Sequence, residues 1–158
     1  MYEYYNIGNN GEIDFRSNWW EAQTFTVGVT PHTVTSVKLL LSRYGSPNTV
    51  TVGIKATDGN GHSTGNDLTN GTTDGNTLTI FPTWREIALT EHTLSANTKY
   101  AIVVIVPSND TNSWILWSAN VLNSSYDGGN DEESRNSGSS WTTYTQSDLM
   151  FEVWGKGF

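Results

Sequence analysis

The segment Tyr100-Ala101-Ile102-Val103-Val104-Ile105-Val106 decides the fold class of this chain. Its apolar residues fill both faces of an extended chain, and most of them are β-branched, which favours a strand over a helix. The run ends at Pro107 and is too short for a buried helix. We therefore predict a central β-strand whose two faces are both covered.

Shorter runs on either side of this segment alternate apolar and polar residues with the period of two typical of half-buried strands. These runs cover residues 22–27, 37–42, 50–55, 78–80, 87–89, 114–117 and 149–154. Asn-Gly and Asp-Gly pairs typical of tight hairpins lie between them. The pattern predicts an all-β protein, an antiparallel sandwich of the jelly-roll type with roughly eight to ten strands and little or no helix. We expect residues 19–158 to form one domain, preceded by an N-terminal arm or first strand over residues 1–18.

Composition and charge exclude several classes of partner. The net charge of −8 argues against nucleic acid, because phosphate binding needs a positive surface. The chain has no cysteine, so neither disulfides nor thiolate metal sites can form. No apolar stretch has the length of a membrane span, and the N-terminus lacks the pattern of a signal peptide. We expect a protein that does not insert into membranes.

Strand and turn motifs along nearly the whole chain carry a family resemblance. The motifs are residues 20–27 (WEAQTFTV), 34–39 (VTSVKL), 43–47 (RYGSP), 58–65 (DGNGHSTG), 84–87 (WREI), 94–100 (LSANTKY), 137–141 (SGSSW) and 148–154 (DLMFEVW). Together they resemble a jelly-roll β-sandwich module of bacterial, archaeal and phage surface proteins, of the choice-of-anchor type. They are also similar in general design to β-sandwich carbohydrate-binding modules. The resemblance implies a binding or structural role at a surface and no catalytic residue.

Residues that could support catalysis are few, and we predict that the chain is not an enzyme. The three histidines, His32, His62 and His92, have no metal-ligand spacing and are interpreted as exposed turn residues. No nucleophile elbow or phosphate-binding glycine loop is present. Glu86 and Glu152 could form a glycosidase-like carboxylate pair, although solvated strand faces explain them more simply.

No cofactor is required by the sequence, but calcium is a candidate. Asp58, Asn60 and Asp67 offer oxygen ligands in a loop region, without the full spacing of an EF-hand. A weaker candidate is the acidic cluster of Asp127, Asp131, Glu132 and Glu133. Asp and Asn are also the ordinary residues of turns, so solvated loops are the alternative interpretation.

Aromatic residues in polar surroundings are the candidate binding residues. We select Trp114, Trp117, Tyr126, Trp141 and Tyr144 as residues that could stack on sugar rings or contact a partner. Because Trp114 and Trp117 are three positions apart, they point to opposite faces of a strand, and only one can lie in a core. Tyr126 and Trp141 have Ser, Gly and Asp neighbours and are expected to be the most exposed. The alternative is that these large rings seal the ends of the sandwich.

Two functions remain open. The first is a multicopy virion component such as a decoration, head-fibre or tail protein, which we expect to be a homo-oligomer contacting other virion or surface proteins. A sandwich that starts close to Met1 without an export signal suits a particle assembled inside a cell. In this interpretation Tyr2, Tyr4 and Tyr5 form an arm that packs on a neighbouring subunit. The alternative is a carbohydrate-binding module that binds glycans. Either function places the chain on a virion or at an extracellular surface.

Overall fold

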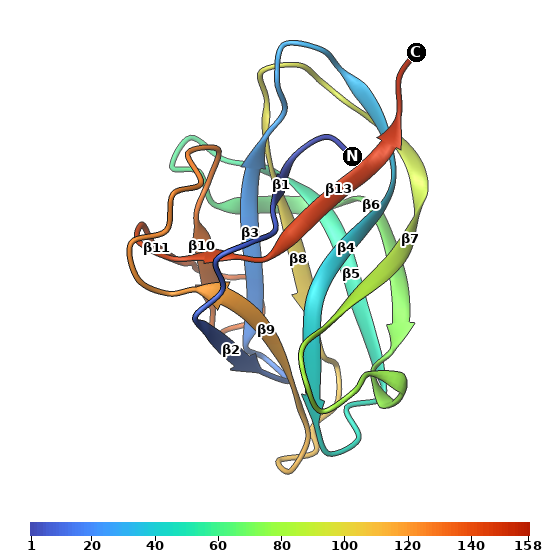
Figure 1. The fold of residues 1–158 in the computed structure, drawn as a ribbon, viewed down its shortest axis with the longest axis vertical. Coiled ribbons are helices and arrows are strands. Elements are labelled where there is room, and N and C mark those ends of the chain that lie inside the picture. Colours follow the sequence, from blue (N-terminus) through green and yellow to red (C-terminus); the bar gives the residue numbers. More distant parts are fainter.

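The computed structural model describes residues 1–158 and confirms the all-β sandwich. Its strands and its single short helix are shown in Figure 1. They are β1 (Tyr4–Tyr5), β2 (Gly11–Phe15), β3 (Trp20–Thr26), β4 (His32–Tyr44), β5 (Thr49–Thr57), β6 (Ser63–Asp74), η1 (Gly75–Thr77), β7 (Thr83–Leu94), β8 (Lys99–Ile105), β9 (Trp114–Asn120), β10 (Asp131–Ser134), β11 (Thr142–Tyr144), β12 (Asp148–Leu149) and β13 (Phe151–Lys156). No helix in the structure has the length and apolar character needed to cross a membrane.

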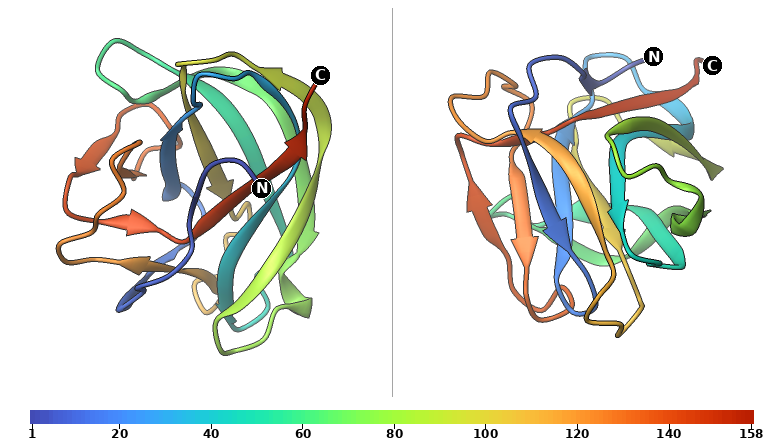
Figure 2. Two further views of the ribbon diagram at one scale, coloured as in Figure 1. Left: turned by 45° about the horizontal axis from the view of Figure 1, so that its top comes forward. Right: turned by 60° about the horizontal axis from the view of Figure 1, so that its bottom comes forward.

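The strands form two antiparallel sheets that face each other (Figure 2). The seven-stranded sheet has the order β1-β13-β4-β9-β12, with β7 added on β4 and β2 added on β9. The six-stranded sheet has the order β11-β10-β3-β8-β5-β6. The two chain ends lie close together at one end of the sandwich (Figures 1 and 2).

Strand β8 is the central strand that the sequence predicted. It pairs with β3 on one side and with β5 on the other. Tyr100, Ile102 and Val104 point into the core between the sheets, where they join the main apolar cluster. Ala101 and Val103 point to the outer face and belong to a second, smaller apolar cluster. Trp20 and Trp141 pack against this cluster. The outward-facing residues Ala101 and Val103 of β8 are therefore covered by the side chains of Trp20 and Trp141.

Large aromatic side chains fill the main core. The bulkiest fully buried residues are Trp117, Phe15, Phe25 and Phe151. Phe25 comes from the six-stranded sheet and Phe151 from the seven-stranded sheet, and their rings meet at 6.1 Å between centroids. Aromatic rings thus supply the apolar volume that the low aliphatic content of the chain leaves unfilled.

The N-terminal residues belong to the sandwich itself. Strand β1 pairs with β13, so that Tyr5 lies opposite Phe151. Tyr2 stacks on the ring of His32 at 3.8 Å, and Glu3 forms an ion pair with the same ring at 3.0 Å. His32 is fully buried, which corrects its interpretation as an exposed turn residue. Tyr2 and Tyr5 are partly buried because they pack against residues of their own chain. Of the three arm tyrosines only Tyr4 is exposed.

Candidate functional site

Trp117 is a core residue, so its selection as a surface binding residue was wrong. Its side chain is fully buried, and its Nε1–H donates to the carbonyl oxygen of Met150 at 2.9 Å. Trp114, three positions earlier, faces the other way and stacks on Tyr44 with ring centroids 4.3 Å apart. The prediction that only one of the two tryptophans lies in the core is confirmed.

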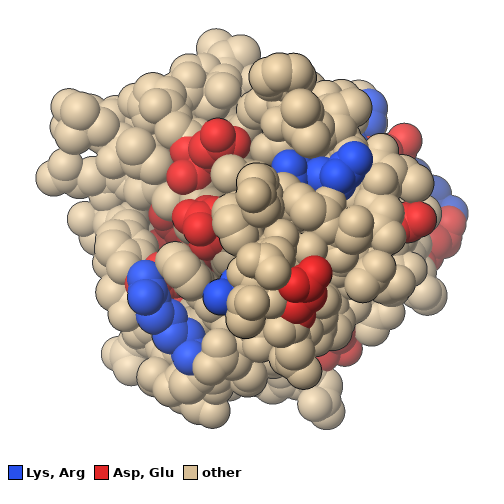
Figure 3. Space-filling model, turned by 90° about the horizontal axis from the view of Figure 1, so that it is seen from below, with Lys and Arg blue, Asp and Glu red and all other residues tan.

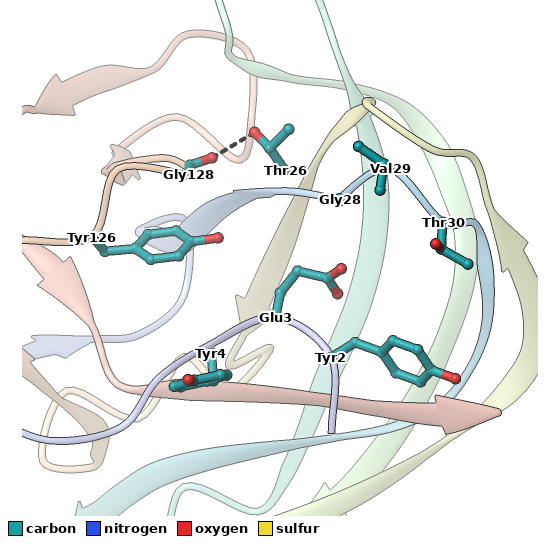
Figure 4. A pocket seen from close by; sticks show the side chains of 9 residues that line it. All are labelled: Tyr2, Glu3, Tyr4, Thr26, Gly28, Val29, Thr30, Tyr126 and Gly128. Atoms are coloured by element: carbon teal, nitrogen blue, oxygen red, sulfur yellow. Dashed lines mark hydrogen bonds between the residues drawn. The ribbon is translucent and has the colours of Figure 1, made fainter. Parts of the chain in front are cut away.

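Tyr126 is also more buried than expected. Its ring packs edge-on against Phe151 at 5.3 Å, and burial raises the pKa of its hydroxyl. With Tyr2 and Tyr4 it lines a shallow hollow of about 480 Å³ (Figure 4). The carboxylate of Glu3, which also lines this hollow, is held by the buried His32. The hollow brings the predicted arm and one predicted binding residue together. However, the ring of Tyr2 is stacked on His32 and the ring of Tyr126 packs against Phe151.

Trp141 lines a deeper concavity on the outer face of the six-stranded sheet, which we call the outer groove. Its volume is about 590 Å³, and it is lined by Trp20, Lys55, Asp58, residues 62–66 and residues 137–141. One wall is the hairpin between β5 and β6, and the other is the loop that precedes β11. Of the 13 lining residues only two, Trp20 and Trp141, are hydrophobic. The outer groove is thus a polar channel that contains two indole rings.

The tip of the β5–β6 hairpin is held across the sheet by an ion pair. His62 Nδ1 lies 3.1 Å from the carboxylate of Glu132 in β10, on the far side of β3 and β8. Glu132 is buried, which raises its pKa, and it also accepts a hydrogen bond from the Thr143 hydroxyl. Within the tip, Asp58 accepts hydrogen bonds from the backbone N–H groups of His62 and Asn60, and these lower its pKa. The hairpin wall of the groove is therefore fixed at both its turn and its contact with β10.

The opposite wall is fixed by short polar contacts and by one glycine. Ser134 Oγ accepts a hydrogen bond from the N–H of Gly138 at 2.8 Å, and Asn136 Oδ1 accepts one from the N–H of Ser140 at 2.9 Å. Gly138 has φ +83°, and a Cβ there would lie 2.6 Å from the ring of Trp20. Only glycine allows this loop to pass so close to the indole. The loop in turn holds the Trp20 ring in place.

Two buried polar atoms on groove residues have no hydrogen-bond partner. These are Oγ of Ser63, a residue that is only 7% exposed, and Nε1 of Trp141. Buried polar groups in folded proteins nearly always find a partner, so these are the two groove atoms whose hydrogen-bonding capacity the protein leaves unused. The Trp141 indole can only donate, whereas the Ser63 hydroxyl can donate and accept.

The charged groups of the outer groove are largely compensated within the protein. Lys55 Nζ lies 3.0 Å from Asp67 Oδ1 and donates to the carbonyl oxygen of Gly65 at 3.0 Å. Asp58 is satisfied by its own turn, as described above. No group of three or more His, Asp or Glu side chains forms that could hold a metal ion. Calcium at Asp58, Asn60 and Asp67 stays a prediction without support from these contacts.

The remaining predicted residues lie outside the outer groove. Tyr144 is exposed and donates to Glu133 Oε1 at 2.6 Å, which raises the pKa of the tyrosine to about 12. Glu86 and Glu152 lie opposite Lys38 on the two strands that flank β4. Neither glutamate lines the hollow of Figure 4 or the outer groove.

Trp20, His62 and Ser63 are groove residues that the sequence did not single out as binding residues. In the sequence, Trp20 and Ser63 stand out only as parts of strand and turn motifs, and His62 only as a candidate exposed turn residue. A usable signal was the position of Trp20 on the same face as Ala22, because small residues beside a tryptophan leave room on a sheet surface.

A comparison with models of known protein families found no match, and a comparison with curated proteins found none. The geometry of the outer groove is therefore the basis of the functional argument.

Proposed function

We propose that this chain is a carbohydrate-binding module and that its ligand lies in the outer groove. The observation that carries the proposal is the pair of unpartnered polar atoms, Ser63 Oγ and Trp141 Nε1, beside the Trp20 and Trp141 rings. A sugar ring offers hydroxyl groups for the two polar atoms and an apolar face for an indole. Concave sites with flat aromatic surfaces and a few placed polar groups are typical of small-ligand binding.

The charge of the outer groove favours neutral sugars. Asp58 is the acidic residue of the groove lining, and the lysine of the lining, Lys55, already contacts Asp67 next to the groove. An anionic glycan would meet like charge there, in a protein of net charge −8. Chains of neutral hexoses are therefore the expected ligand class.

A glycan array tests this proposal when it is run with matched variants. We expect the wild type to bind one or more neutral oligosaccharides. Trp141→Ala should weaken binding at least about tenfold, because it removes both a ring and a donor. Ser63→Ala should weaken it by a smaller factor. Trp114→Ala is the matched control, since this tryptophan is half-buried and lies outside the groove.

Absence of binding to every glycan would contradict the proposal. So would binding that survives in Trp141→Ala but is lost in Trp114→Ala.

A multicopy assembly on a virion or extracellular surface is the second candidate function. It is favoured by exposed apolar side chains in the loop before β7, where Ile80 is 64% and Phe81 is 72% exposed. Such side chains can form contacts between copies or with other surface proteins.

Light scattering tests this second function. The wild type should then have a mass above that of the monomer, and Phe81→Ser should lower this mass. A monomeric wild type at high concentration would exclude self-assembly through this loop.

A further inference from the structure

Acidic side chains replace apolar ones at one edge of the sandwich interior. On β3 and β10, Glu21, Asp131 and Glu133 occupy positions that face inward, as Phe25 does further along β3. Glu21 is 1% and Asp131 is 2% exposed. Burying carboxyl groups costs free energy unless they have partners, so the fold alone does not explain this choice of residues. Local departures from an apolar core are expected at functional sites.

These residues line a concavity of about 320 Å³ between the edges of the two sheets, which we call the acidic pocket. Glu12 and Asp14 of β2, in the seven-stranded sheet, form its other side. Trp19, Arg135 and Tyr144 complete its lining together with smaller side chains. Figure 3 shows that acidic side chains lie at several places on the lower face of the molecule, some of them next to basic side chains.

The carboxyl groups of the acidic pocket are only partly satisfied by the protein. Asp131 Oδ2 accepts from the Ser147 hydroxyl at 2.7 Å, and Glu21 Oε2 accepts from Trp19 Nε1 at 3.2 Å. No N–H or hydroxyl group donates to Asp131 Oδ1. Its carboxylic neighbour is Glu21, whose pKa is raised by burial and by a hydrogen bond with Asp131. Burial raises the pKa of both acids, and no basic side chain of the protein is paired with either of them.

Arg135 shows what kind of group fits at the mouth of the acidic pocket. Its guanidinium lies 4.0 Å from the centroid of the Trp19 ring, and its Nε is 3.4 Å from Glu133 Oε1. A cation between an aromatic face and a carboxylate is a common way to bind guanidinium and ammonium groups. The Arg135 side chain is 66% exposed, so it is weakly held and can be displaced.

We propose that the acidic pocket binds the guanidinium or primary ammonium group of a ligand. The ligand cation takes the place of Arg135 on Trp19 and Glu133, with Asp131 and Glu21 behind it. An organic cation fits better than a metal ion, because the carboxyl groups form no metal-holding cluster and an aromatic ring is part of the wall. This site is separate from the outer groove and does not depend on carbohydrate binding.

Agmatine, which carries both cationic groups on a short chain, is a suitable probe at neutral pH and low salt. We expect the wild type to bind agmatine, and Glu133→Gln and Trp19→Leu to weaken this binding. Arg135→Ala should tighten it, roughly two- to fivefold, because the internal competitor and its positive charge are removed. Lys156→Ala is the control for general charge, since Lys156 pairs with the exposed Glu91.

If Arg135 had only a structural role, its replacement by alanine would not tighten the binding of agmatine. The proposal is overturned if neither the wild type nor Arg135→Ala binds agmatine. Equal affinities of the wild type and Arg135→Ala would also overturn it, as would binding of uncharged 1,4-butanediol with the affinity of agmatine.

Discussion

Glu21 is a buried acid whose ionisation is changed by folding. Burial and the neighbouring Asp131 raise its pKa well above the ordinary value, so the folded state retains a proton that the unfolded chain loses. A raised pKa of an acid contributes stability at low pH, and this contribution is lost as the pH rises through the folded pKa. The free energy of unfolding should therefore fall as the pH increases above about 4.

Glu21→Gln tests this pH dependence. The amide can donate to Asp131 at every pH and still accept from Trp19. We expect the variant to be more stable than the wild type at pH 8 and its stability to depend less on pH. Asp131, Glu132 and Asp148 also have raised pKa values, so some dependence will remain. Urea denaturation at several pH values measures the effect, with Glu91→Gln as an exposed control. Parallel pH profiles for wild type and Glu21→Gln would contradict the raised pKa of Glu21.

Trp117 and Trp114 should respond very differently to truncation. Trp117→Ala removes the largest fully buried side chain and should lower the free energy of unfolding by about 3–5 kcal/mol. Trp114→Ala removes a half-buried ring stacked on Tyr44 and should cost about 1 kcal/mol. Chemical denaturation measures both. Equal costs for the two variants would show that the assignment of the strand faces is wrong.

Residue patterns predict which way a side chain points along a strand, but they do not predict whether that side is buried. The alternation around Trp117 showed that it and Trp114 face opposite ways, but the side that becomes core depends on the partner strands. Tyr126 has Ser, Asp and Gly neighbours, yet Phe151 lies beside it in space. His32 was read as a turn residue, since its partners Tyr2 and Glu3 are about 30 positions away in the sequence.

Strands with a clear period of two could be predicted from the sequence, whereas very short strands and the polar strand β6 could not, and the run 78–80, expected as a strand, lies in the loop after η1. The central strand β8 and the half-buried β5 follow directly from their residue patterns. Strands β1, β11 and β12 have only two or three residues and show no periodicity, which is why the structure exceeds the roughly eight to ten strands expected.

Deletion of residues 1–6 tests the role of β1. The deletion exposes the β13 edge, uncovers His32 and removes Tyr5 from the core margin. We expect the free energy of unfolding to drop by about 2 kcal/mol or more. If the segment serves only as an arm for a neighbouring subunit, the deletion will lower the mass in light scattering and leave the unfolding midpoint unchanged.

The β5–β6 hairpin tip depends on the ion pair between His62 and Glu132. His62→Ala should increase hydrogen exchange of the tip amides while the exchange of β8 stays unchanged, because only a local contact is lost. His92→Ala is a matched control in another strand. If tip exchange is unaltered, the ion pair does not hold this wall of the outer groove.

At the scale of the whole molecule, candidate sites form where segments distant in sequence meet. The outer groove joins Trp20, the β5–β6 hairpin and the 137–141 loop, and the acidic pocket joins strands of both sheets. The all-β class could be predicted from the sequence, and Trp141, selected there as a candidate binding residue, lines the outer groove. The grooves themselves could not, because strand order determines which loops become neighbours.

The indole N–H signals of the seven tryptophans provide the most direct test of carbohydrate binding in the outer groove. In ¹H–¹⁵N spectra, addition of a neutral oligosaccharide should shift the signal of Trp141 most, because its Nε1–H gains a hydrogen-bond acceptor. Trp20 should shift as well, whereas the signal of buried Trp117 should stay in place. Binding that moves Trp114 or Trp84 and leaves Trp141 unchanged would contradict the outer groove as the carbohydrate site.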